Sequence, residues 1–255
     1  MIGLGAVLDW LEGDGLALFW GGFLCFVRTG AVMALLPAFG EQSVPARFRL
    51  GLALALTLAV APAVASPMPI TPAAILAEAL AGLALGAGFR LFVIALQTAG
   101  AMAAQATSLS QIFASAGAEP QSAISALLTM AALSLAFTMG LHVRAAEALI
   151  LSYNVLPLGQ FPAAPDMTEW GLAQISHSFA LAFSLAAPFL IGGLLYNAAL
   201  GVINRAMPTL MVSFVGAPAL TFGGLVLLAI AAPLMLAVWL SGWSAWLADP
   251  FSIPR

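Results

Sequence analysis

The stretch HVRAAE brings together the residue types that bind metals or transfer protons, in His142, Arg144 and Glu147. A zinc site would need further His or carboxylate ligands close by, and the whole chain holds only two His. Arg144 and Glu147 are three residues apart, which places them on one face of a helix where they can form an ion pair. We therefore predict a structural ion pair near a helix end and no metal site.

A second histidine, His177, lies between Ser176 and Ser178 in the stretch ISHSF. Adjacent residues of a helix point about 100° apart, so neither serine makes a good nucleophile–base pair with the imidazole. The chain has no G-x-S-x-G turn and no carboxylate obviously placed to orient His177. A phosphate-binding G-x-x-x-x-G-K-[ST] loop is excluded because the chain contains no Lys. We predict a non-enzyme with no catalytic residue, no cofactor and no metal.

Two further charges, Glu78 and Arg90, stand alone in a long apolar stretch. Charges at membrane depth either pair with another group or face a wet pathway, so each could mark a transport route. Twelve residues separate them, which is about 18 Å along a helix, and they cannot pair within it. The alternative is a charge near a helix end or one that pairs with a partner subunit.

The rest of the composition explains why such charges are rare. Of 255 residues, 63% are hydrophobic and only 7% are charged, whereas soluble domains carry about 25% charged residues. Most of the outer surface must therefore meet lipid or other protein. The net charge of −3 gives no argument for nucleic acid. Cys25 is the single cysteine, so an intramolecular disulfide and a four-thiolate zinc site are both excluded.

Apolar runs separated by Pro, Gly and charged residues predict an all-α, polytopic-looking membrane-associated protein. About 20 residues are needed to cross the hydrocarbon core, so one run is marginal and several are too long, which indicates bent helices or helices packed on protein. The six predicted helical segments are approximately 16–39, 50–66, 73–104, 123–156, 171–200 and 219–247.

The distribution of charges gives a topology. Arg47 and Arg49 lie in the first connection and Arg205 in the fifth, whereas Asp166 and Glu169 lie in the fourth. The positive-inside rule then places the odd connections in the cytoplasm and both termini outside.

The third segment contains two glycines four residues apart, Gly82 and Gly86, within LAGLALGAGF. Small residues at this spacing allow two helices to approach closely. The approach is either a contact between subunits or packing within the chain.

Two polar stretches interrupt the apolar sequence. QATSLSQIFASAGAEPQS, at 105–122, is by composition a loop between two helices. In the second stretch, Asn197 and Asn204 are seven residues apart and share a helical face, Arg205 follows, and Pro208 stops or kinks the helix. Two amides and a guanidinium on an apolar helix need partners, so this cluster is either a ligand site or a lock between helices.

This second stretch resembles the R subunit of the flagellar type III export gate (the FliR family, with injectisome counterparts). The shared pattern is N-x-A-L-G-x-x-N-R-x-x-P followed by L-x-V-x-x-V-G-x-P. Its residues here are Asn197, Ala199, Leu200, Gly201, Asn204, Arg205 and Pro208, then Leu210, Val212, Val215, Gly216 and Pro218. Chain length, order of the apolar runs and the central polar interruption are similar over nearly the whole chain.

The resemblance implies a P-like helical part over 1–170 and a Q-like helical hairpin over 171–255. It implies a non-enzymatic pore subunit that assembles with P and Q subunits, largely above the membrane plane, and passes unfolded flagellar substrates. The further implied partners are the B protein (the substrate switch), the A protein of the export apparatus and the basal-body ring. The implied location is the flagellar basal body in the bacterial inner membrane. The positive-inside topology would then describe insertion and not the final geometry.

The resemblance also implies roles for residues. The loop at about 106–122 becomes a channel plug, in which Ile112 and Phe113 narrow the pore and Gly117 acts as a hinge; Ser110 and Gln111 belong to the same plug. Subunit packing is assigned to Asn197, Asn204, Arg205, Pro208, Gly82 and Gly86. The alternatives are a structural membrane scaffold and a small-solute transporter that uses Glu78, Arg90 and the Asn197–Arg205 cluster.

Overall fold

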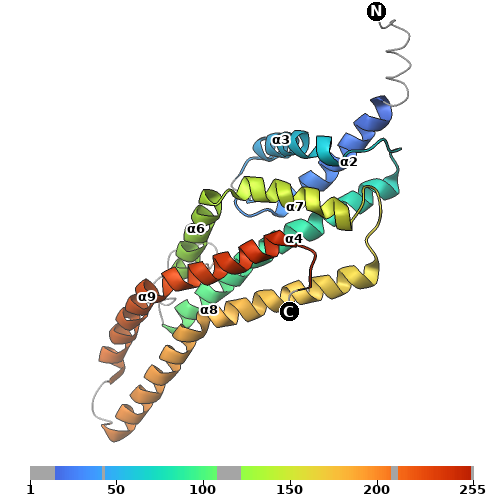
Figure 1. Cartoon of the computed structure of the whole chain (residues 1–255). Coiled ribbons are helices and arrows are strands. Elements are labelled where there is room, and N and C mark those ends of the chain that lie inside the picture. Colours follow the sequence, from blue (N-terminus) through green and yellow to red (C-terminus); the bar gives the residue numbers. More distant parts are fainter. Residues whose placement is uncertain (1–14, 42–43, 108–121, 208–211, 254–255) are drawn as a thin grey trace, which may run out of the picture. The chain divides into compact units, whose positions relative to one another are not determined.

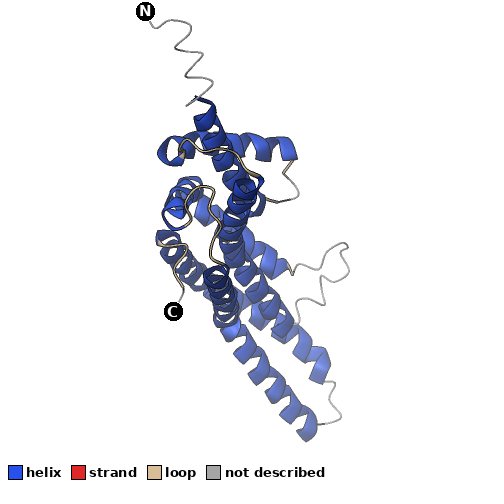
Figure 2. Cartoon of the chain, turned by 90° about the vertical axis from the view of Figure 1, so that its right-hand side faces the viewer, coloured by secondary structure: helices blue, strands red, loops and turns tan. Residues whose placement is uncertain are grey.

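The described part of the chain is built from helices joined by turns and loops, without a strand (Figure 1, Figure 2). The computed structural model describes residues 15–41, 44–107, 122–207 and 212–253. The predicted all-α class is confirmed for these residues. The helices are α2 (Leu16–Leu35), α3 (Ala46–Val64), α4 (Pro72–Ala106), α6 (Ala123–Thr138), α7 (Leu141–Val155), α8 (Ala164–Ala206) and α9 (Val212–Ala248).

The excess length of the predicted fourth segment, 123–156, indicated a bent helix or one packed on protein, and the structure confirms a bend. The segment is divided into α6 and α7, whose axes are bent by 74° at a short break. Gly140 lies at this break with φ of +78°, the left-handed region that glycine enters without steric cost. The backbone of Gly140 turns the chain and begins α7.

Two helices are longer than the hydropathy pattern predicts. The segment predicted at 171–200 forms α8 from Ala164 to Ala206, and the one at 219–247 forms α9 from Val212 to Ala248. The added turns at both ends of α8 each contain charge, with Asp166 in the first turn and Arg205 in the last. These charges match the signs that the helix dipole favours at each end, so the helix continues after the apolar run has stopped.

The helices are suited to a membrane. Five of them are long and apolar enough to cross a bilayer, and the bent α6–α7 pair would bring the number to six. This agrees with the predicted six apolar segments. The proposed orientation of the connections stays a prediction.

The chain forms two compact units, and the first comprises residues 1–91, 140–174 and 245–255. Within it α2 packs closely on α4 at the two predicted small residues. A Cβ atom at Gly82 would overlap the carbonyl oxygen of Arg28, and one at Gly86 would lie 3.0 Å from Cβ of Leu35. The structure thus shows packing within the chain, the second of the two alternatives; a subunit contact at these glycines stays a prediction.

The second unit comprises residues 92–139 and 175–244. The core of this unit includes Phe189 of α8 and Trp239 of α9, both almost fully buried, and the indole of Trp239 donates a 2.8 Å hydrogen bond to the carbonyl oxygen of Phe92. Three of the four boundaries between the units fall inside α4, α8 and α9, and the fourth falls between α6 and α7. The predicted division into P-like and Q-like parts at residue 170 comes from the family resemblance, whereas the two units are defined by contacts. The predicted division therefore stays a prediction.

Candidate functional site

The predicted plug residues Ser110, Gln111, Ile112, Phe113 and Gly117 lie outside the described residues. The structure does describe the chain on both sides of this segment, at the end of α4 and the start of α6. Both places belong to the second unit.

The end of α4 is held by close packing. Thr107 is buried, and its hydroxyl donates a 2.9 Å hydrogen bond to the carbonyl oxygen of Ala103. A Cβ atom at Gly224 of α9 would lie only 2.6 Å from Cβ of Thr107, and one at Gly193 of α8 would lie 2.7 Å from the carbonyl oxygen of Ala106. Two glycines therefore let α8 and α9 come close to the last turn of α4.

The start of α6 is held by hydrogen bonds. Ser122 is the N-cap, and its hydroxyl oxygen accepts a 3.1 Å bond from the backbone N–H of Ser125, which satisfies one of the free donors of the first turn. The hydroxyl of Ser125 donates a 2.6 Å bond to the carbonyl oxygen of Gln97. Gly100 permits this approach, since a Cβ atom there would lie 2.6 Å from Cα of Ser125. The described residues on both sides of the segment 108–121 are therefore held within the second unit.

The second predicted site lies at the end of α8. Asn197, Asn204 and Arg205 are exposed, and Pro208 lies outside the described residues. A neighbouring side of the helix meets α9, where the Tyr196 hydroxyl donates a 2.6 Å hydrogen bond to the carbonyl oxygen of Gly216. The cluster therefore makes no lock between these two helices, and its assignment to subunit packing stays a prediction.

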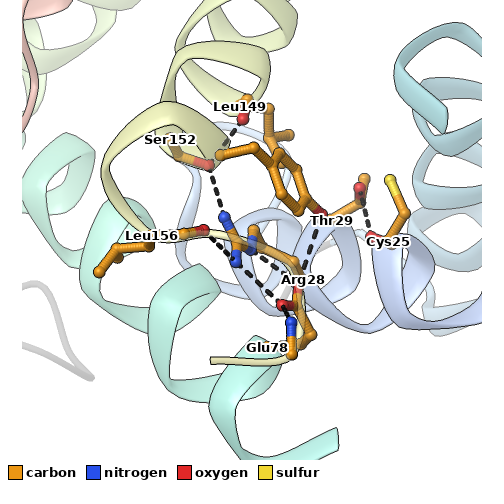
Figure 3. Close-up of polar contacts among 9 residues, drawn as sticks. Cys25, Arg28, Thr29, Glu78, Leu149, Ser152 and Leu156 are labelled. Atoms are coloured by element: carbon orange, nitrogen blue, oxygen red, sulfur yellow. Dashed lines mark hydrogen bonds and ion pairs between the residues drawn. The ribbon is translucent and has the colours of Figure 1, made fainter. Parts of the chain in front are cut away.

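A third site, which the sequence analysis missed, is buried in the first unit (Figure 3). Arg28 of α2 and Glu78 of α4 form an ion pair in which both side chains are fully buried. Two hydrogen bonds join them, from Nε to Oε2 at 2.8 Å and from Nη2 to Oε1 at 2.9 Å. This bidentate geometry fits the planar guanidinium to the carboxylate and is among the strong forms of the hydrogen bond.

The remaining atoms of the ion pair are satisfied by α7 and the residues that follow it. The guanidinium donates to the hydroxyl of Ser152 at 3.0 Å and to the carbonyl oxygen of Leu156 at 2.9 Å (Figure 3). Its Cζ atom lies 3.7 Å from the centre of the Tyr153 ring, a cation–π contact. The carboxylate of Glu78 accepts a 2.8 Å bond from the backbone N–H of Gly159.

This network joins α2, α4 and α7 at one point, and every nitrogen and oxygen atom of the ion pair has a hydrogen-bond partner within the chain. A buried charge is tolerated only when it is paired and hydrogen-bonded, and both conditions hold here. Glu78 is therefore neither part of an open pathway nor in need of a partner subunit. The small-solute transporter hypothesis can no longer use Glu78 as a site residue. Arg90, its companion in that hypothesis, forms a partly exposed 2.6 Å ion pair with Glu41 in the same unit.

The local ion pair was predicted correctly. Arg144 and Glu147 lie 3.4 Å apart on the exposed side of α7. The ring of His177 packs edge-on against Phe92, with ring centres 6.3 Å apart. Within the described ranges, no group of three or more His, Cys, Asp or Glu side chains could hold a metal ion.

Comparisons with known proteins agree with these observations. The family model described as "Bacterial export proteins, family 1" matches residues 19–245. The chain is 33% identical to "Flagellar biosynthetic protein FliR" of Caulobacter vibrioides over 225 residues, which is 85% of this chain and 90% of the relative. It is 30% identical to the protein of the same name from Escherichia coli over 246 residues, covering 89% and 87% of the two chains. It is also 26% identical to the Bacillus subtilis protein of that name, covering 76% and 79%.

Proposed function

The chain belongs to the bacterial export proteins of family 1, the FliR family of the flagellar export apparatus, and on this premise we propose that it is the R subunit of the export gate. Its role in flagellar protein export follows from the family. The finer proposal is a non-enzymatic component of the inner-membrane basal body that forms, with P and Q subunits, the channel for unfolded flagellar substrates. The family match over residues 19–245 carries this proposal.

The lengths of the helices favour a subunit of a larger assembly and argue against a chain that stands alone in the lipid bilayer. Helices α4, α8 and α9 contain 35, 43 and 37 residues. At 1.5 Å per residue they are about 52, 64 and 55 Å long, whereas the hydrocarbon core is about 30 Å thick. Their large exposed apolar side chains, such as Leu194 and Ile230 at 70% and 71% exposure, cannot all lie in lipid unless the helices tilt strongly. Neighbouring subunits would cover the remainder.

The contacts at the ends of the segment 108–121 support the plug hypothesis. A plug formed by this segment would have both of its ends anchored in the second unit, because Thr107 packs against Gly224 and Ser125 is bonded to Gln97. The composition of the segment suits a plug, because Ser, Gly and Gln keep a loop from adhering to an apolar wall, while Ile112 and Phe113 supply bulk.

The buried Arg28–Glu78 pair would give the subunit a fixed joint. Removing one charge of a buried pair is costly, so the intact pair favours the arrangement of α2, α4 and α7 in which both charges are satisfied. Such a rigid contact would help the subunit keep these three helices in place while P and Q subunits assemble around it.

The test is assembly. The chain is produced together with tagged P and Q subunits, extracted in a mild detergent and purified through the tag. We expect a stable complex that contains all three proteins. Recovery of P and Q without this chain would contradict the proposal, and specific binding of a small solute by the chain alone would favour the transporter alternative. Association with the B and A proteins of the export apparatus and with the basal-body ring would be measured in the same preparation.

A further inference from the structure

The second unit is almost free of charge, and this makes Arg205 exceptional. Residues 92–139 and 175–244 contain only two charged side chains, Glu119 and Arg205. Glu119 lies outside the described residues. Arg205 is exposed in the last turn of α8, and no hydrogen bond or ion pair reaches it from the described part of the chain. The dipole of α8 favours a cation at this end, and a charge on an otherwise apolar hairpin is stabilised further where it pairs with an anion.

Arg205 lies on an exposed face of α8 that has room for a second helix. With 100° per residue, five exposed positions fall within an arc of about 100°. We call these positions the Asn–Arg face: Leu194, Asn197, Gly201, Asn204 and Arg205. A Cβ atom at Gly201 would meet nothing within 4 Å, so the centre of the face is open.

Helix α9 does not cover this face. It contacts α8 through Tyr196, whose hydroxyl bonds to the carbonyl oxygen of Gly216, and through Leu200, whose Cδ1 would lie 3.0 Å from a Cβ atom at Gly216. By the same helical spacing, Tyr196 and Leu200 point about 60–100° away from Asn197, on the side opposite Arg205. The Asn–Arg face is therefore open to a neighbour.

We infer that the Asn–Arg face receives an apolar helix of a partner subunit, which lies against Gly201 and places one Asp or Glu carboxylate on Arg205. The amides of Asn197 and Asn204 would bond to the backbone or to polar side chains of that helix. Small residues flanked by amides are the usual composition of such close contacts between helices in apolar surroundings. The inference rests on the proposed function, because it takes the partner from the export gate.

A lipid phosphate is the other anion that Arg205 could meet, and the amides argue against it. Asn197 lies eight residues before Arg205, which is about 12 Å along the helix. If Arg205 reached the headgroups from this apolar hairpin, Asn197 would lie inside the hydrocarbon layer. An amide without partners is costly there. A partner helix satisfies both amides and the charge together.

The first test measures assembly. The native chain, Arg205→Gln, Arg205→Glu and Gly201→Leu are each produced with tagged P and Q subunits. The control Arg144→Gln removes an exposed Arg that already has a partner, Glu147, within the chain. We expect recovery of the chain with P and Q to fall at least tenfold for Arg205→Glu and Gly201→Leu, and less for Arg205→Gln. The control should behave like the native chain.

Two results separate the inference from the function on which it rests. If the native chain recovers no P or Q, the proposed function fails. If the native chain and all three variants recover P and Q equally, only the inference fails. Gly201→Leu blocks the close approach without touching the charge, and Gly201 has open space in the free chain, so this variant keeps the test valid should Arg205→Glu fold poorly.

The second test identifies the neighbour. A photoreactive benzophenone side chain replaces Leu194, which is 70% exposed on the Asn–Arg face, and in a control it replaces Phe222 of α9, also 70% exposed. We expect a cross-link from position 194 to a helix of P or Q, and Asp or Glu→Arg in that helix should restore recovery of Arg205→Glu. A cross-link to lipid alone, or to the segment around Glu119 of the same chain, would overturn the inference.

Discussion

Arg28 and Glu78 lie 50 residues apart in the sequence and meet in two parallel hydrogen bonds of 2.8 and 2.9 Å, with both side chains fully buried. One residue comes from α2 and the other from α4, and the carbonyl oxygen of Leu156 and the N–H of Gly159 complete the site. The pair therefore fixes three separate parts of the first unit. It also accounts for one fully buried charge of each sign inside predominantly apolar helices.

The first prediction concerns this ion pair. Glu78→Gln leaves the guanidinium of Arg28 buried without a counter-charge, which costs about 3–5 kcal/mol when one member of such a pair is removed. We expect the free energy of unfolding in detergent to fall by that amount. The double variant Arg28→Met with Glu78→Gln removes both charges and keeps an acceptor for Gly159, so its loss should be smaller than that of Glu78→Gln alone.

The control for the ion pair is Arg90→Gln. Arg90 and Glu41 are about one third and two fifths exposed, so water already solvates much of both groups. Pairs of this kind contribute about 1 kcal/mol or less. Equal losses for Glu78→Gln and Arg90→Gln would show that the buried pair has no special role.

The second prediction concerns Gly82, where α2 and α4 approach each other. A methyl group there would overlap the carbonyl oxygen of Arg28, so Gly82→Ala must push the two helices apart. Overpacking of this type costs about 1–3 kcal/mol, and we expect a lower melting temperature. At Gly51 of α3 the space is open, and Gly51→Ala should raise stability by up to about 1 kcal/mol through helix propensity. Destabilisation by both variants alike would point to a general intolerance of alanine.

The third prediction concerns Gly140, the residue at the break between α6 and α7. Its φ of +78° costs a residue with a Cβ atom about 1–2 kcal/mol. Space is not limiting, since an added Cβ atom would lie 4.0 Å from its nearest neighbour, Val143. Gly140→Ala should therefore lose this amount in a chemical unfolding experiment, and Gly140→Asn should lose less because Asn enters the left-handed region more readily. Equal losses for the two would exclude backbone strain as the cause.

Local features could be predicted from the sequence because they depend on neighbouring residues. The spacing of Arg144 and Glu147 fixes their distance on any helix, and the ion pair is present at 3.4 Å. Long apolar runs predicted the helices in the same way. The ends of α8 were placed too far inward because hydropathy marks where a helix is apolar, whereas a helix continues through Asp166 and Arg205 without being apolar.

The features that were missed depend on tertiary contacts. Nothing near Arg28 in the sequence indicates that its partner is 50 residues away, although one buried cation and one buried anion in separate apolar runs are a signal that could have been used. Excess length predicted a bend in the fourth segment, but the position of the break at Gly140 was not predicted, for a related reason. One glycine in an apolar run is often tolerated inside a helix, so only the surrounding packing decides whether the chain bends there.

The last prediction concerns the segment 108–121 and the proposed plug. Deleting residues 110–116 removes Ile112 and Phe113 but keeps Thr107 and Ser122, whose contacts hold α4 and α6 in the second unit. The complex with P and Q should still assemble, because the deletion leaves these contacts in place. Its conductance in a planar bilayer should rise clearly above that of the native complex, since bulky side chains no longer block water and ions. A milder variant, Phe113→Ala, should leak less than the deletion, and Ser110→Ala, which removes no bulk, should not leak. Normal assembly with unchanged conductance in the deletion would exclude the plug, whereas lost assembly would assign the segment to subunit contact.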